Sequence, residues 1–250
     1  MQLSIKNKNV LSIYSYRFAA ALLCALALTP FARSQTVDIA ARAEVVPQGG
    51  NPHSAHASAA NVVVWLTSTQ KNPPPAPPLK TQQYTLAQKD KQFIPHVLVV
   101  PTGSSVDFPN LDPFFHNVFS LFNGKRFDLG LYEAHTHRAV QFDREGVSYI
   151  FCNIHPEMGA IIISLSTPYF AISRRDGTIT LHDVPPGMYR LNVWAENVAI
   201  DRLNALSRIV EISPQNAQLG TLHLETSGDV MKHHKNKFGE SYVPLPKDPY

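Results

Sequence analysis

The sequence predicts an all-β fold built from two β-sandwiches. Short apolar runs recur along the chain, and several of them alternate with polar residues. Turn signals separate the runs, among them Glu145-Gly146, Asp176-Gly177 and Pro185-Pro186-Gly187. Only the stretch Asn197–Leu206 has a helical pattern. Many short strands between Gly/Pro turns are typical of sandwiches.

The expected strands are runs rich in β-branched and aromatic residues. In chain order they are Val37–Val46, Asn61–Thr67, Val97–Val100, Ser105–Phe108, His116–Leu121, Arg138–Phe142, Val147–Cys152, Ala160–Leu165, Tyr169–Ile172, Thr178–His182, Tyr189–Ala195, Ser207–Ile212 and Thr221–Glu225. The Pro-rich stretch 72–78 cannot donate to a sheet ladder, so we expect an extended surface loop there.

The first 34 residues have the pattern of a secretory signal peptide. A basic segment that ends at Arg17 precedes the uncharged run Phe18–Leu28, and Ala32-Arg33-Ser34 forms a cleavage signal. We therefore expect a periplasmic or secreted protein. A lipoprotein acylated at Cys24 is the alternative.

The remaining chain predicts two β-domains and a tail. We expect the first sandwich over residues 35–166, the smaller second one over 167–226, and a polar tail over 227–250. Residues 35–70 can instead pair with the second domain. About 60 residues make a thin sandwich with a small core, so added strands would help to close it.

The charge of the chain changes once the leader is removed. The leader contains four basic residues and no acidic one, which leaves 22 − 4 = 18 basic against 19 acidic residues, a formal charge of −1. A chain so close to neutral lacks the excess of basic residues that proteins use to bind nucleic acid. No later apolar run is long enough to span a bilayer. We therefore expect neither a nucleic-acid partner nor a membrane span.

The cysteine count is the next constraint. Without the leader the chain has the single cysteine Cys152, so a disulfide within the chain is impossible. An odd cysteine in an oxidising compartment indicates intermolecular pairing, a reactive thiol or a metal.

The stretch around this cysteine contains a set of possible metal ligands. Cys152, His155 and Met158 lie within seven residues, and His116 precedes an apolar run upstream. Two imidazoles, one thiolate and a weak axial thioether are the ligands of a mononuclear blue-copper site. A thioether is a poor match for zinc. A Cys–His nucleophile pair is another possibility, but no third group is visible to orient it.

These residues resemble the cupredoxins, with a ligand loop spaced as in amicyanin. The resemblance covers about Gln92–Ser166. It runs through Phe93, Pro95, Val100, Gly103, Val106, Phe108, Asn110, Asp112, Asn117, Val118, Phe142, Glu145, Gly146, Tyr149 and Gly159. It implies a Greek-key sandwich that holds one type 1 copper. His116, Cys152 and His155 would be its equatorial ligands, Met158 its axial ligand, and Asn117 a residue that braces the cysteine loop.

The longer arrangement resembles periplasmic proteins labelled methylamine-utilisation proteins. These combine a cupredoxin with a C-terminal carboxypeptidase-regulatory-like β-domain. Asp183–Arg190 is similar to the turn and strand of a prealbumin-like sandwich.

The resemblance implies a carrier of single electrons, not an enzyme. Its partner would be a redox protein, such as a cytochrome or a periplasmic dehydrogenase, and the electron would pass through an exposed ring edge of His155. The alternative is a copper-binding adhesion, assembly or copper-handling module. His135 and His137 are spaced to share one strand face, but a solvated loop is the simpler interpretation.

Overall fold

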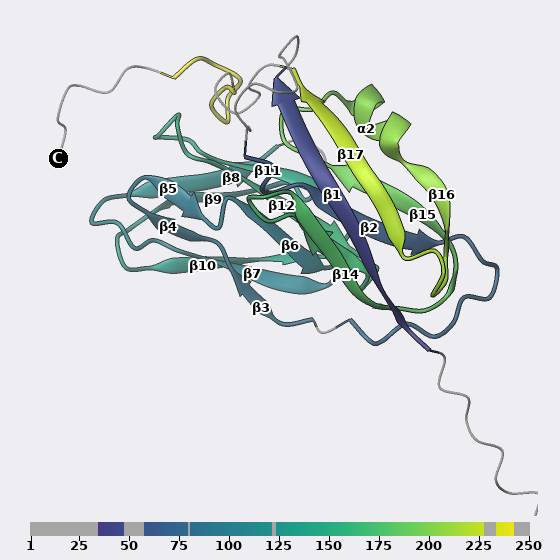
Figure 1. Ribbon diagram of the computed structural model, residues 1–250. Coiled ribbons are helices and arrows are strands. Elements are labelled where there is room, and N and C mark those ends of the chain that lie inside the picture. Colours follow the sequence, from purple (N-terminus) through teal and green to yellow (C-terminus); the bar gives the residue numbers. More distant parts are fainter. Residues whose placement is uncertain (1–34, 48–57, 80, 122–123, 228–233, 243–250) are drawn as a thin grey trace, which may run out of the picture. The chain divides into compact units, whose positions relative to one another are not determined.

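The computed structural model describes residues 35–47, 58–79, 81–121, 124–227 and 234–242 (Figure 1). The chain divides into the units Met1–Gln35 and Thr36–Tyr250, and the description below concerns the second unit. The predicted signal peptide and Cys24 lie outside the described residues. Within the described part, no helix has the length and apolar character needed to cross a membrane.

The first sandwich packs a five-stranded sheet against a three-stranded one. The larger sheet has the order β6 (Val97–Pro101), β12 (Gly159–Leu165), β11 (Gly146–Cys152), β8 (His116–Ser120) and β9 (Phe127–Tyr132). The smaller sheet has the order β10 (His137–Phe142), β7 (Ser104–Pro109) and β3 (Gln83–Thr85). The short strands β4 (Ala87–Lys89) and β5 (Gln92–Ile94) pair with each other.

The core of this sandwich follows from the alternation of side chains along its strands. In β7, Ser104, Val106 and Phe108 are buried, while the residues between them are partly exposed. The inward side chains meet Phe142 and Ile150 in one apolar cluster that also contains Cys152 and Met158. The sulfur-bearing residues therefore belong to the core from which the sheets gain their stability.

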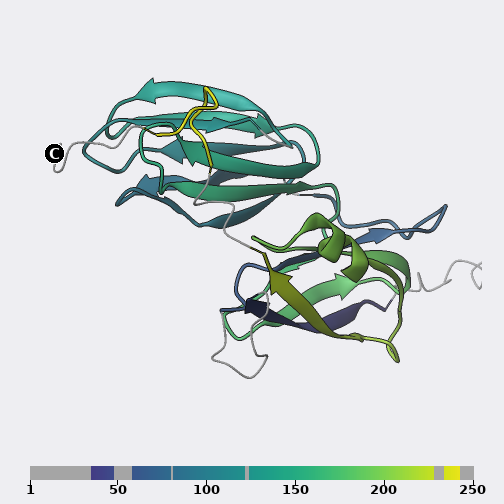
Figure 2. The ribbon, with the colours of Figure 1, turned by 90° about the horizontal axis from the view of Figure 1, so that it is seen from above.

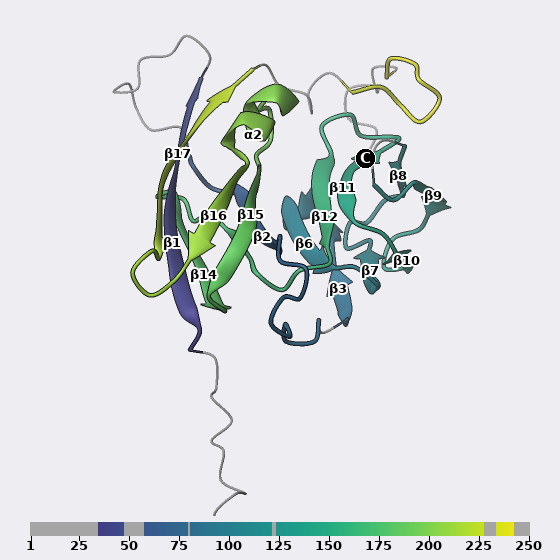
Figure 3. The same cartoon turned by 90° about the vertical axis from the view of Figure 1, so that its right-hand side faces the viewer.

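The second sandwich contains two further sheets, seen edge-on in Figure 3. One has the order β14 (Thr178–Val184), β1 (Val37–Pro47) and β17 (Gln218–Thr226). The other has the order β13 (Phe170–Ile172), β2 (Val63–Ser68), β15 (Gly187–Trp194) and β16 (Arg208–Ile212), and the helix α2 (Ile200–Leu206) follows β15. Both strands from residues 35–70 thus pair with strands that follow residue 166.

The prediction of an all-β fold built from sandwiches is confirmed. The structure adds β3, β4, β5 and β9, which the sequence did not indicate. The first three have three residues each and are too short for a pattern to be visible. In β9, FDLGLY, Phe127 and Leu129 pack against the core but stay partly exposed, and only Tyr132 is buried, so the apolar face of this strand is weak.

Candidate metal centre

Pairing between β8 and β11 brings the predicted ligands to one end of the first sandwich. These strands are antiparallel, and Cys152 at the end of β11 lies opposite Val118, two residues after His116. The loop after Cys152 then folds back: the Met158 N–H donates to the His155 carbonyl at 3.1 Å, and the Cys152 N–H donates to the Met158 carbonyl at 3.2 Å. These two backbone hydrogen bonds hold the loop from Cys152 to Met158 in a compact turn.

Three ligand atoms converge at this end. The Cys152 Sγ lies 3.6 Å from the Nδ1 atoms of both His116 and His155, and these two nitrogens are 3.2 Å apart. A triangle with these sides has a centre about 2.0 Å from each corner, close to ordinary metal–nitrogen and slightly below metal–sulfur distances. Among the described residues, this is the group of His, Cys, Asp and Glu side chains whose atoms could hold a metal ion.

Burial sets the protonation of the three groups. His116, Cys152 and His155 are at most 1% exposed. Desolvation lowers the pKa of His116, and desolvation together with the charge of His116 lowers the pKa of His155 to about 4. Both imidazoles are therefore neutral near pH 7, the form in which histidine binds metal. Burial raises the pKa of the Cys152 thiol, so a metal ion has to displace its proton.

A buried carboxylate fixes the orientation of His116. Asp112 Oδ2 lies 2.9 Å from Nε2 of His116, and the Asp112 carboxylate also accepts the N–H groups of Asp90 and Lys91. These hydrogen bonds hold the pKa of Asp112 below its usual range despite its burial. An ionised Asp112 requires Nε2 to carry the proton, which leaves Nδ1 free to bind a metal. Sequence reasoning included Asp112 in the resemblance but gave it no role; its position four residues before His116 was the available signal.

Asn117 and Met158 lie beside the group. The Asn117 carbonyl accepts the N–H of Asn153 at 2.8 Å, and the Asn117 side chain donates to Asp128 at 2.7 Å. Asn117 therefore contacts the cysteine loop through its main chain. Met158 is fully buried in the same apolar cluster as Cys152.

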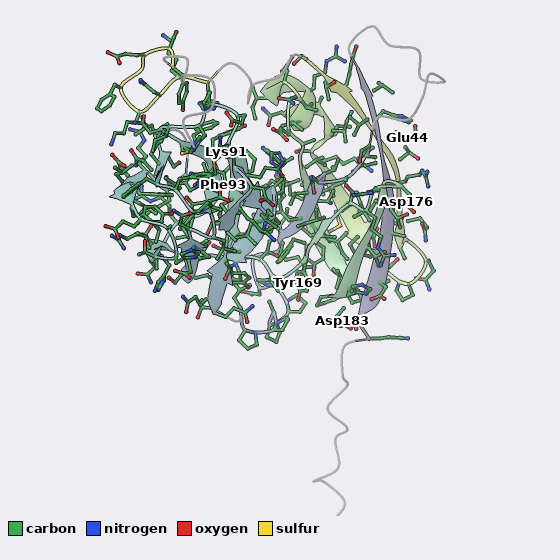
Figure 4. All side chains as sticks on the ribbon, turned by 90° about the vertical axis from the view of Figure 1, so that its left-hand side faces the viewer. Glu44, Lys91, Phe93, Tyr169, Asp176 and Asp183 are labelled. Carbon is green, nitrogen blue, oxygen red and sulfur yellow. The ribbon has the colours of Figure 1, made fainter. Side chains whose placement is uncertain are left out.

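The structure corrects the expected exposure of His155. Its ring is buried, and its Nε2 has no hydrogen-bond partner among the described residues. The ring of Phe114 packs at 5.5 Å from the His155 ring and 5.3 Å from the His116 ring, measured between centroids. The Lys91 ammonium lies over Phe114, 5.4 Å from the ring centroid; Lys91 is labelled in Figure 4. The phenyl ring therefore covers the imidazoles, and the expectation that the His155 ring edge is exposed is wrong.

The other predicted histidine pair lies apart from the group. His137 begins β10, is largely exposed and pairs with Asp107 at 2.7 Å. His135 precedes it in a turn, with a positive φ of 60°. Neither belongs to the metal-binding group.

Comparisons with known proteins give similarity at the level of structure. No protein-family model and no curated protein matches the chain. A purple cupredoxin from Nitrosopumilus maritimus is 21% identical at a TM-score of 0.30, over 33% of this chain and 99% of that protein. Amicyanin from Paracoccus versutus is 20% identical at a TM-score of 0.31, over 40% of this chain and 97% of that protein. A copper-containing nitrite reductase from Thermus scotoductus is 23% identical at a TM-score of 0.32, over 40% of this chain but 25% of the enzyme. Similarities at these TM-scores do not establish a function.

Proposed function

We propose that this protein binds one copper ion and carries single electrons, as a type 1 copper protein. His116, Cys152 and His155 would hold the ion, and Met158 would be a further, weaker ligand. The observation that carries the proposal is the triangle of one sulfur and two neutral nitrogens, held in a dry core before any ion binds. Sulfur and imidazole ligands together suit both oxidation states of copper.

The chain's own residues would keep the site rigid. Bound copper would supply the one-electron chemistry. Asp112 holds the His116 ring, and the hydrogen bonds between Cys152, His155 and Met158 hold the loop. A ligand set that does not move between oxidation states lowers the barrier to electron transfer, because less of the structure has to reorganise.

Burial favours a carrier over an enzyme. Ligand residues that are at most 1% exposed leave little room for a substrate, whereas an electron can cross a few ångströms of packed protein. The electron partner would be another redox protein. The signal-peptide pattern supports a periplasmic or secreted location, where a single cysteine bound to metal would be protected from oxidation.

A visible absorption spectrum of the copper-loaded protein, with its copper content, tests the proposal. We expect one copper per chain and an intense thiolate-to-copper band in the oxidised protein. Cys152→Ser should abolish the band, because a hydroxyl does not replace the soft sulfur. His116→Ala should open the site to added imidazole, whereas His137→Ala, an exposed histidine outside the group, should leave the spectrum unchanged. A coloured copper site in Cys152→Ser would show that the ligand assignment is wrong. Copper binding without a reversible redox wave would favour a copper-handling module.

A further inference from the structure

The segment from His234 to Tyr242 lies against the loop that bears the proposed copper ligands. In Figures 1 and 2 this yellow segment lies over the strands of the first sandwich. The Tyr242 hydroxyl donates to the Cys152 carbonyl at 2.8 Å. The backbone N–H of Lys237 donates to Asn153 Oδ1 at 2.9 Å. Two consecutive loop residues are thus bound by a segment more than 80 positions further along the chain.

His234 binds the same loop at a further point. Its Nε2 donates to the Pro156 carbonyl at 2.7 Å, directly after His155. Its ring stacks on Phe151, with centroids 4.0 Å apart and planes inclined by 21°. The Tyr242 hydroxyl lies 3.2 Å from His234 Nδ1, so the two aromatic residues also support each other. The residues before and after the ligands are therefore held by the same pair of side chains.

A second connection reaches the strand that bears His116. The Lys237 ammonium lies 2.8 Å from Asp128, and the same carboxylate accepts the side-chain amide of Asn117. Asn117 follows His116 directly and binds the loop at Asn153. The segment thus contacts the cysteine loop directly and reaches the stretch that bears His116 through Asp128.

We propose that His234 and Tyr242 are positioning residues that hold the cysteine loop closed and set the reduction potential of the site. We call these two side chains, in contact with that loop, the clasp. The proposal rests on the proposed copper function. A thiolate with two neutral imidazoles leaves a net charge of +1 around Cu(II) and 0 around Cu(I). A dry environment disfavours the charged state, so the clasp raises the potential by keeping water from the loop.

The experiment compares Tyr242→Phe and His234→Ala with Lys235→Gln in the full chain. Lys235 lies in the same segment with an exposed side chain, and its contact to His234 uses the backbone carbonyl, which the substitution keeps. In the copper-loaded protein, voltammetry should give a lower potential for Tyr242→Phe and His234→Ala than for the wild type. The control should match the wild type.

A second readout does not depend on copper. In the copper-free protein Cys152 is fully buried, so its alkylation by iodoacetamide requires the loop to open. Loss of the Tyr242 hydrogen bond should speed alkylation about fivefold, the factor that one neutral hydrogen bond represents. His234→Ala should have a larger effect, because it removes a stacked ring as well. Lys235→Gln should react like the wild type.

The two readouts separate the two proposals. Faster alkylation in Tyr242→Phe and His234→Ala supports a clasp even if the wild type lacks a reversible copper wave, in which case the carrier function fails alone. Alkylation rates and potentials equal to those of the control would overturn the clasp. Faster alkylation with unchanged potentials would overturn its role in setting the potential.

Discussion

Acid should weaken the copper-free protein through His155. Its pKa is lowered from 6.5 to about 4 in the folded chain, so at pH 5 the unfolded chain binds a proton that the folded chain excludes. At that pH the unprotonated fraction of this ring is about 3% in the unfolded state and about 91% in the folded state, a ratio of about 30. This ratio corresponds to about 2 kcal/mol of lost stability at pH 5, against almost none at pH 7.

Urea unfolding of the copper-free protein at pH 7 and pH 5 measures this loss. The matched variant is His155→Gln, which keeps a neutral polar side chain but cannot be protonated. The wild type should lose about 2 kcal/mol more than the variant between the two pH values. An equal loss in both proteins would show that His155 is solvated in the folded state, and the account of a dry ligand triangle would be wrong.

Three further predictions concern Asp112, Met158 and His96. Asp112→Asn should weaken copper binding about tenfold, because the neutral amide no longer strengthens its imidazole partner as a donor. Met158→Gln should keep copper but lower its potential, because an amide oxygen favours Cu(II), while Met158→Leu should raise it. The hydrogen bond to Glu196 is the main cause of a raised pKa of His96 in the folded protein. The free energy of unfolding should therefore fall as the pH rises through that raised pKa. In His96→Gln this part of the fall should disappear.

Each of these predictions has an outcome that contradicts it. Chelator competition should show weaker copper affinity in Asp112→Asn but not in the control Asp143→Asn, which changes an exposed ion pair. Equal copper affinities in the two variants would show that the buried carboxylate has no role in binding. Equal potentials in both Met158 variants and the wild type would make Met158 a core side chain only. An identical decline with pH in His96→Gln, followed by urea unfolding, would assign the decline to other groups.

The sequence predicted the long strands because their side chains alternate between a core and a surface. In β7 this alternation is complete, so the run Ser105–Phe108 was visible. The strand β9 is stabilised by its pairing with β8, whose five residues are all buried. The apolar side chains of β9 itself, Phe127 and Leu129, are only partly buried against the core, so its sequence pattern is weak. Local sequence reasoning therefore finds strands with a fully buried apolar face more readily than strands whose apolar side chains are partly exposed.

The site shows the same division between residue chemistry and tertiary packing. The donor atoms could be predicted because few residue types offer a soft sulfur and an imidazole nitrogen, and the structure brings His116, Cys152 and His155 together. Their exposure could not be predicted, because it depends on where Phe114 packs. The contact of Tyr242 with the cysteine loop could not be predicted either, because the sequence of a polar tail does not indicate which part of the fold it contacts. Donor chemistry is encoded locally, whereas the dielectric around the donors is a tertiary property, and the reduction potential depends on both.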